Sequence, residues 1–476
     1  MTESIAIMWF RNDLRLADNP ALRAACNDGK ILPIYILEDD DADDCDKIGA
    51  ASRVWLHHSL QALNHSLDGK LQYFVGKAED ILMKLCHELT IASVHWNRAY
   101  EPWRMTRDQQ IKERLKTKDI QAQSYKANLL WEPWEVTKAD GTPYRVFTPF
   151  YRRGCLNAES PRRPLEAPAH IDFANNAEIG KDLEFLSLLP KQEWHQDLIR
   201  NWQCGEEGAR KALLSFLDGS ISNYSDGRNL PAKPYVSRLS PHLHYGEISV
   251  NQCWYAALDR FGMAHDGCDT FLSELGWREF SASLLFYNHH LKTDPLNQKF
   301  IHFPWRSSET DLSAWQKGMT GYPIVDAGMR ELYQTGYMHN RVRMIVGSFL
   351  VKNLRLHWHH GETWFWDCLF DADHASNSAS WQWIAGCGAD AAPYFRVFNP
   401  ITQAERFDGQ AEYIKKYVPE LKKLPAKYIG APFDAPNHVL EAANITLGKD
   451  YPHPIVDAKQ SRLDALDAFA TLKEVS

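Results

Sequence analysis

The chain has 476 residues, of which 44% are hydrophobic and 24% are charged, and its formal net charge is −8. This length allows two or three domains with cores of their own, and the composition is that of a globular protein. An acidic balance disfavours non-specific nucleic-acid binding over the whole surface, and no apolar run reaches the roughly 18 residues that a membrane span needs. Nine cysteines without a Cys-x-x-Cys pair indicate a reducing compartment, here the cytoplasm, and argue against zinc or an iron–sulfur cluster.

Short β-type runs alternate with helical patterns over residues 1–130. The runs cover residues 4–10, 31–37, 71–75, 92–96 and 120–125. This alternation predicts a Rossmann-like parallel α/β domain. The first run is not followed by Gly-x-Gly-x-x-Gly, and the domain has no Walker A motif, so a dinucleotide or NTP site of those kinds is not expected.

Residues 131–200 are predicted to form a linker, because prolines and basic pairs interrupt every regular pattern there. Helical periodicity then dominates to about residue 470, which predicts a second, all-helical domain over residues 201–470. Its main helices are expected at residues 207–217, 247–261, 267–287, 324–336, 339–355, 362–369 and 376–386.

The most informative stretch is residues 371–400, in which Trp381 and Trp383 stand two residues apart. On a helix they point about 200° apart and cannot serve the same surface. Asn377, four residues before Trp381, shares its face. The spacing is unusual for packing alone and is typical of a site with two ligands.

Two other helical faces combine polar and large apolar side chains. One carries Glu274, Trp277 and Arg278, and the other carries Asn340, Arg343 and Met344. Such faces are either ordinary surfaces with ion pairs or the walls of a site for a polar, aromatic ligand. Ser240-Pro241 is expected to begin a helix. Its N-terminus could bind an anion, or Ser240 could simply be the N-cap.

Several sequence blocks together resemble the photolyase/cryptochrome family, in register from residue 4 to about 465. They are Trp-Phe-Arg-Asn-Asp-Leu-Arg-Leu (9–16), Ser-Arg-Leu-Ser-Pro-His-Leu (237–243), Glu-Leu-Gly-Trp-Arg-Glu-Phe (274–280), Thr-Gly-Tyr-Pro-Ile-Val-Asp-Ala-Gly-Met-Arg (320–330), Tyr-Met-His-Asn-Arg-Val-Arg-Met (337–344) and residues 371–400. Within the family, the chain looks most similar to the class I cyclobutane pyrimidine dimer photolyases.

The resemblance implies one noncovalent FAD in the helical domain. The implied contacts are Tyr224, Val236, Ser237, Arg238, Leu239, Ser240, Phe271, Arg278, Arg343, Asp371, Ala372, Asp373 and Asn377. Hydroxyl and backbone N–H groups at 236–240 suit a pyrophosphate, and the amide of Asn377 suits flavin N5. Flavin redox chemistry belongs to the cofactor, and the protein adjusts it electrostatically.

The resemblance also implies a substrate, UV-damaged DNA whose pyrimidine dimer is flipped out of the duplex. The implied contacts are Arg228, Glu274, Trp277, Asn340, Arg341, Met344 and Trp383. Trp277 and Trp383 would stack on the bases, and Arg341 would bind a phosphate. Met344 separates the chain from (6-4) photolyases, which usually have His in this helix, and from DASH cryptochromes, which usually have Gln at this position.

The implied reaction is light-driven electron transfer from reduced FAD to the dimer, followed by ring opening. Trp305, Trp358 and Trp381 match the family's electron relay, and Asn377 and Glu274 complete the expected catalytic set. This reaction needs no general acid or base, which agrees with the lack of a hydrolytic triad or metal cluster. His339 and His374 are expected to be structural, with proton handling as the alternative.

An antenna pigment is expected in the N-terminal domain. Asn97, Glu101 and Lys292 match positions used for 5,10-methenyltetrahydrofolate, with a deazaflavin or an empty cleft as alternatives. We expect a monomer with no membrane partner. The competing functions are a signalling cryptochrome without repair activity and a flavin- or nucleotide-binding α/β protein of another kind.

Overall fold

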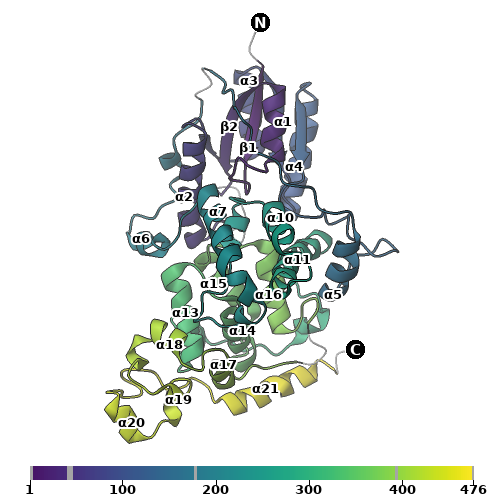
Figure 1. Ribbon diagram of the computed structural model, residues 1–476. Helices are drawn as coiled ribbons and strands as arrows, with labels where there is room; N and C mark the ends of the chain where they lie inside the picture. Colours follow the sequence, from purple (N-terminus) through teal and green to yellow (C-terminus); the bar gives the residue numbers. More distant parts are fainter. Residues whose placement is uncertain (1–3, 40–46, 176–178, 392–394, 474–476) are drawn as a thin grey trace. The chain divides into compact units, whose positions relative to one another are not determined.

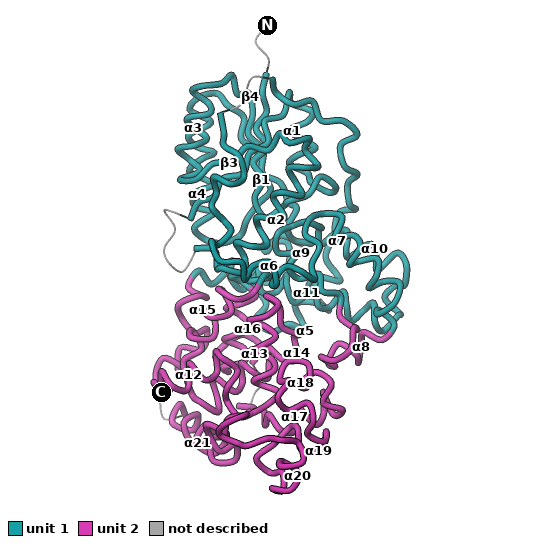
Figure 2. The backbone as a smooth tube through the Cα atoms, turned by 90° about the vertical axis from the view of Figure 1, so that its left-hand side faces the viewer, with its two compact units in different colours: residues 1–222, 237–289, 370–375 teal, residues 223–236, 290–369, 376–476 magenta. Residues whose placement is uncertain are grey.

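The computed structural model describes residues 4–39, 47–175, 179–391 and 395–473. The chain divides into two compact units, coloured separately in Figure 2. Unit 1 comprises residues 1–222, 237–289 and 370–375, and unit 2 comprises residues 223–236, 290–369 and 376–476. No helix of the described segments is both long enough and apolar enough to cross a membrane.

Unit 1 contains a five-stranded parallel sheet in the order β3-β2-β1-β4-β5 (Figure 1). The strands are β1 (Ile5–Phe10), β2 (Lys30–Leu37), β3 (Gln72–Val75), β4 (Ile91–Asn97) and β5 (Gln121–Tyr125). The strand order reverses between β1 and β4, where doubly wound sheets form a crevice at the carboxyl ends of their strands. The predicted parallel α/β fold is confirmed.

The alternation of side chains along β1 explains the two layers of helices. Even-numbered residues of β1 share a core with α1 (Pro20–Asp28) and α2 (Ala50–Ser66). Odd-numbered residues share a second core with α3 (Ala78–Glu88) and α4 (Pro102–Lys116). Every residue of β1 is buried, as expected for a parallel strand covered on both faces.

The rest of unit 1 is mainly helical. It contains α5 (Phe147–Pro149), α6 (Trp194–Ile199), α7 (Glu206–Ser215), α9 (Ser240–His244), α10 (Val250–Phe261) and α11 (Asp266–Tyr287). Within the predicted linker, α5 runs directly into a π-helical turn at Phe150–Gly154. This segment is an ordered part of unit 1 that packs on α11, which its proline content did not indicate.

Unit 2 is built from helices and loops. They include α8 (Tyr224–Gly227), α12 (Glu309–Gln316), α13 (Pro323–Thr335), α14 (Asn340–Ser348), α15 (Trp358–Cys368), α17 (Pro400–Phe407), α18 (Glu412–Tyr417), α19 (Ala426–Ile429), α20 (Asn437–Ala442) and α21 (Ala458–Thr471). The helix α16 (His374–Ala385) begins in unit 1 and continues in unit 2.

Two helices of unit 2 differ from the prediction at their ends. The predicted helix over 339–355 ends as an α-helix at Ser348 and continues as a π-helical turn, Phe349–Asn353. The helix expected at 362–369 begins already at Trp358, because the His357 ring accepts a hydrogen bond from the backbone N–H of His359 at 3.2 Å and caps it.

Candidate functional site

The two tryptophans of α16 lie in different surroundings. Trp381 is 3% exposed, and its ring centroid lies 5.0 Å from that of Phe365 and 6.2 Å from that of Trp315. Trp383 is half-buried, and its indole N–H donates to the carbonyl oxygen of Asp390 at 3.1 Å. The predicted division of α16 into two faces is confirmed, whereas the ligand of each face stays a prediction.

The three tryptophans of the expected relay all belong to unit 2. Trp381 and Trp358 are buried and Trp305 is half-buried. The His357 ring contacts both Trp305 and Trp358, with centroid distances of 5.1 and 5.6 Å. One helical turn after Trp358, a Cβ atom built on Gly361 would lie 2.1 Å from Cη2 of Trp381. Two of the three indoles are thus buried and one is partly exposed, and His357 contacts Trp305 and Trp358; their role as an electron relay stays a prediction.

Two histidines of unit 2, the buried His339 and the half-buried His357, cap helices. The His339 ring accepts a hydrogen bond from the backbone N–H of Arg341 at 3.2 Å and caps α14. Burial, reinforced by the charge of Arg343, lowers the pKa of His339 to about 4. Burial likewise lowers the pKa of His357 to about 4. Both rings are neutral at neutral pH, in agreement with the structural role expected for His339.

Asn377 is held by α15. Its side-chain N–H donates to the backbone carbonyl oxygen of Glu362 at 3.0 Å, and the Ser378 hydroxyl donates to the Glu362 carboxylate. Burial raises the pKa of Glu362 to about 7. One N–H of the amide is thus donated to α15, which leaves the carbonyl oxygen as an acceptor and the second N–H as a donor for a ligand.

Three arginines cluster in unit 2. Arg341 donates from Nε and Nη2 to Oδ1 of Asn229 at 3.2 and 2.6 Å, and its guanidinium lies 4.6 Å from the ring centroid of Phe407. Burial, followed by the charges of Arg228 and Arg406, lowers the pKa of Arg341. Arg228 and Arg341 were predicted DNA contacts, whereas Arg406 was missed, because an isolated arginine far along the chain gives no sequence signal.

The predicted stripe on α14 is present. Asn340 is exposed at its start, and Arg343 and Met344 are half-buried one turn later. Arg343 donates from Nε to the carbonyl oxygen of Met338 at 2.8 Å, and its guanidinium lies 5.6 Å from the ring centroid of Tyr337. These two contacts tie Arg343 to the residues just before α14.

In unit 1, α11 carries the other stripe. Glu274, Trp277 and Arg278 are all half-buried. The Trp277 ring is stacked on Phe147, with centroids 3.8 Å apart and planes at 11°. Arg278 donates from Nη1 to the carbonyl oxygen of Asn128 at 2.5 Å. Trp277 is thus in contact with the linker, and Arg278 with the end of the N-terminal domain.

Glu279 is a buried acid of α11 that sequence reasoning missed. Its carboxylate accepts hydrogen bonds from the backbone N–H groups of Leu130 and Trp131 at 2.8 and 3.2 Å, and Arg278 lies 3.4 Å away. Burial raises the pKa of Glu279 to about 7, against the opposing effect of Arg278. This acid attaches the linker to α11 beside the candidate site.

The remaining predicted FAD contacts of unit 1 have distinct environments. Arg238 adopts a left-handed backbone conformation, with φ of 54°, and its guanidinium lies 3.9 Å from the Trp202 ring centroid. Phe271 is 3% exposed. Burial lowers the pKa of His244, whereas the nearby charges of Asp373 and Asp371 raise it. Two predicted carboxylates thus act electrostatically on one half-buried imidazole.

The predicted FAD contacts belong to both units. Unit 1 holds Ser237, Arg238, Leu239, Ser240, Phe271, Arg278, Asp371, Ala372 and Asp373, and unit 2 holds Tyr224, Val236, Arg343 and Asn377. Tyr224 is buried, with the guanidinium of Arg228 5.7 Å from its ring centroid. Each unit thus holds part of the set that the resemblance implies, and its role in binding FAD stays a prediction.

The residues expected to contact an antenna differ in accessibility. Asn97, at the end of β4, is 1% exposed; its amide donates to Asp13 and, at 2.8 Å, to Asn19. Glu101 forms an ion pair with Arg104 at 3.2 Å. Asn97 is thus part of a buried hydrogen-bond network with Asp13 and Asn19, while Glu101 remains partly exposed. The third residue of this set, Lys292, belongs to unit 2.

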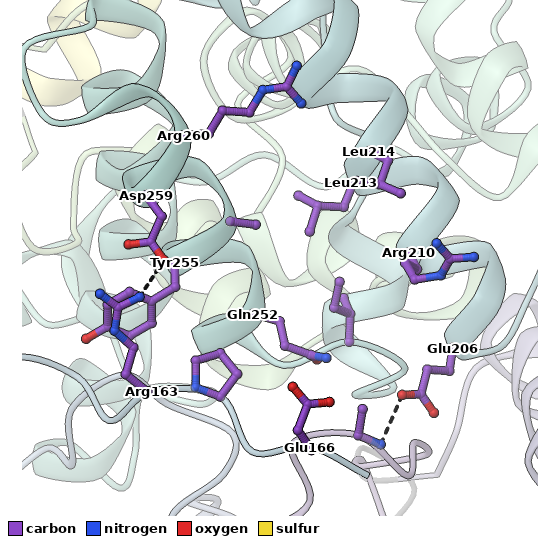
Figure 3. Close-up of a pocket in the computed structure, with 14 residues that line it drawn as sticks. Arg163, Glu166, Glu206, Arg210, Leu213, Leu214, Gln252, Tyr255, Asp259 and Arg260 are labelled. Carbon is purple, nitrogen blue, oxygen red and sulfur yellow. Dashed lines mark hydrogen bonds and ion pairs between the residues drawn. The ribbon is translucent and has the colours of Figure 1, made fainter.

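A cavity of about 800 Å³ opens in unit 1 (Figure 3). Its wall includes Arg163, Glu166, Arg210, Tyr255 and Asp259, and the Arg163 guanidinium lies 4.0 Å from the ring centroid of Tyr255. None of the predicted FAD, DNA or antenna contacts lines it. Among the described residues, no group of three or more His, Cys, Asp or Glu side chains is arranged to hold a metal ion.

Comparisons with known proteins agree with this picture. Residues 6–169 match the family model described as DNA photolyase, and residues 271–471 match the FAD-binding domain of DNA photolyase. A deoxyribodipyrimidine photo-lyase from Agrobacterium fabrum is 46% identical over 99% of this chain and 98% of its own length. Cryptochrome-1 from Arabidopsis thaliana is 34% identical over 98% of this chain and 70% of its own length.

A solved structure described as a bacterial class III photolyase from Agrobacterium tumefaciens matches with a TM-score of 0.95 at 46% identity, covering 100% of this chain and 98% of that one. A cryptochrome from Synechocystis matches with a TM-score of 0.89 at 27% identity, covering 98% and 99%. The chain therefore belongs to the photolyase/cryptochrome family. The comparisons do not single out class I within it.

Proposed function

We propose that this protein is a DNA-repair enzyme that uses blue or near-ultraviolet light to split cyclobutane pyrimidine dimers. The observation that carries the proposal is its similarity to a relative named for this activity, at 46% identity over 99% of the chain. Each unit separately supports it: the half-buried indole of Trp277 in unit 1 suits stacking on a base, and the cluster of guanidiniums in unit 2 suits phosphates.

FAD, when bound in its reduced form, supplies the electron that opens the cyclobutane ring and accepts it again afterwards. In this proposal, the residues of this chain bind and orient the FAD. Ser237 and Ser240 bind the pyrophosphate, and Asp373 accepts hydrogen bonds from the ribose or the flavin. The amide of Asn377, fixed by Glu362, presents its carbonyl oxygen to flavin N5–H.

For the substrate, Trp277 and Trp383 are proposed to stack on the two flipped bases. Glu274, Asn340 and Met344 meet the edges of the pyrimidines. The cationic cluster of Arg228, Arg341 and Arg406 binds phosphates near the lesion. Although the chain is acidic overall, this cluster gives it a local positive charge at the proposed substrate site.

The subgroup and the antenna are also proposals. In place of class I, we propose class III, because the structure so described matches 100% of this chain at 46% identity. We keep an antenna of the methenyltetrahydrofolate type, with a deazaflavin as the alternative, in the domain of residues 1–130. Of its expected contacts we retain Glu101 and Lys292, because Asn97 is buried and hydrogen bonded. Absorbance of the pigment released by denaturation tests this choice.

The second candidate function is a cryptochrome-type photoreceptor without repair activity, favoured by the 34% identity to a plant cryptochrome. The two are separated by incubating reduced, FAD-loaded protein with a thymine-dimer oligonucleotide in blue light and in the dark. If the protein is a repair enzyme, dimers are lost in the light and not in the dark. Flavin photochemistry without dimer loss supports the photoreceptor. We further propose a cytoplasmic monomer, in keeping with the eight free cysteines among the described residues.

A further inference from the structure

The stack between Phe147 and Trp277 joins two segments that are far apart in the sequence. The ring centroids are 3.8 Å apart, and the planes are at 11°. Isolated aromatic pairs prefer offset or edge-to-face arrangements over such a close parallel one. The surrounding packing must therefore hold Phe147 against this face of the indole.

Two neighbouring rings hold Phe147 in place. Phe147 is 7% exposed, and it is stacked with Tyr151 at 5.7 Å and meets Phe280 at 6.0 Å and 66°. Tyr151 in turn lies on the backbone of α11, since a Cβ atom built on Gly276 would be 2.5 Å from Cδ2 of Tyr151. Gly276 directly precedes Trp277. The backbone of α11 therefore supports the Tyr151 ring, and Tyr151 in turn supports Phe147.

An ion pair adds a further attachment between the same two segments. Arg152 donates to both carboxylate oxygens of Asp269, at 2.7 and 2.5 Å, in the first turn of α11. This pair is partly exposed and adds little stability, but its two-point geometry fixes the register of the segment on the helix. The stretch 147–152 is thus attached to α11 along its length.

We infer that Phe147 is a positioning residue that holds the indole plane of Trp277 ready for a flipped-out base. Within the part of the chain that the structure describes, the ring partners of Trp277 are Phe147 and Phe280. Phe147 covers one face of the indole, so a base stacks on the opposite face and meets a ring that is already oriented. This inference rests on the proposed function and adds a linker residue to its substrate site.

A double-mutant cycle tests the inference on the full-length, FAD-loaded and reduced protein. The measurement is the dissociation constant, in the dark, for an oligonucleotide with one thymine dimer. Phe147→Ala should weaken binding about two- to tenfold, the range expected for losing one aromatic pair. Phe147→Tyr should bind as the unsubstituted protein does. In a Trp277→Ala background, Phe147→Ala should have no further effect, because it acts through the indole.

Phe150→Ala is the matched control. Phe150 belongs to the same segment but packs on Phe280 at 5.2 Å and on Tyr144 at 6.1 Å. Its replacement should lower the melting temperature and leave dimer affinity unchanged. If Phe147→Ala does not retain FAD, Phe147→Leu takes its place in the same cycle.

The inference would be overturned if Phe147→Ala left the affinity for the dimer unchanged. It would also be overturned if Phe147→Ala weakened dimer binding equally in the presence and in the absence of Trp277. Neither result would affect the proposed dimer repair. A parent protein that binds the dimer no better than undamaged DNA would instead contradict the proposed function itself.

Discussion

The indole of Trp381 lies directly on the backbone of Gly361. A Cβ atom at position 361 would be 2.1 Å from Cη2 and 2.4 Å from Cζ3 of this ring. Such distances leave no room for a methyl group, so the place of Trp381 depends on a glycine in α15. Gly347 of α14 also approaches the ring, but a Cβ atom there would be 3.6 Å from Cζ3, an ordinary contact.

Gly361→Ala should therefore displace Trp381. Overpacking of about 1–3 kcal/mol should exceed the helix-propensity gain of about 1 kcal/mol and lower the free energy of unfolding. Photoreduction of oxidised flavin should slow, because the displaced indole is one of the two buried members of the proposed relay. Gly347→Ala is the control and should be neutral or slightly stabilising. Equal photoreduction rates in the two variants would show that the position of Trp381 is not critical.

Trp305→Phe should separate photoreduction from repair. Trp305 is the half-buried end of the series, so its loss should block electron supply to oxidised flavin. Repair by protein that is reduced chemically beforehand should be nearly unchanged. Flavin absorbance under illumination and dimer loss are measured on the same samples. Trp194→Phe, at a tryptophan that is 44% exposed, should change neither. An equal loss of both activities on replacing Trp305 argues against the relay.

Trp277→Ala should weaken binding to a dimer-containing oligonucleotide by about 1–3 kcal/mol, the usual contribution of one stacked base. Affinity for undamaged DNA should change little, because it depends on phosphate contacts. Trp134→Ala replaces a tryptophan of unit 1 that is 48% exposed and should leave both affinities unchanged. If dimer affinity survives in the Trp277 variant, this residue is not part of the substrate site.

Glu279 should make stability depend on pH. Its pKa is raised by burial from 4.5 to about 7 in the folded protein, so folding favours the protonated acid. The stabilisation is complete at pH values below the unfolded pKa and is lost as the pH rises to about 7. As the pH rises from about 4.5 to about 7, the free energy of unfolding of the unsubstituted protein should therefore fall relative to that of Glu279→Gln. The fall should be at most about 1.4 kcal/mol per pH unit. Denaturant unfolding at a series of pH values measures the difference, and a constant difference would mean that Glu279 does not titrate there.

Much of the fold could be predicted because the patterns are local. The buried runs of β1, β2 and β4 and the amphipathic periods of α10 and α13 depend on residues close together in the chain. The same is true of the opposed tryptophans of α16, whose separation follows from helix geometry. The π-helical turn at Phe349–Asn353 escaped prediction, since its apolar sequence continues the helical pattern without a break.

The site was predicted less completely, because its supporting contacts are long-range. Phe147 meets Trp277, and the backbone at Leu130 meets Glu279, across more than a hundred residues. Neither pair has a spacing that a single sequence can reveal. Asn97 is an example of a sequence match that misled. Its position matches an antenna contact, but the sequence does not reveal that its side chain is buried and hydrogen bonded.

The most direct test of the account is dimer repair by the pure, FAD-loaded and reduced protein. A thymine-dimer oligonucleotide is illuminated with blue light without oxygen, and the ultraviolet absorbance of the restored pyrimidine double bonds is followed against a dark sample. The account predicts a rise in the light that converts all bound dimers over many turnovers, and no rise in the dark. Absence of any light-dependent rise, with FAD reduced and the oligonucleotide bound, would contradict it.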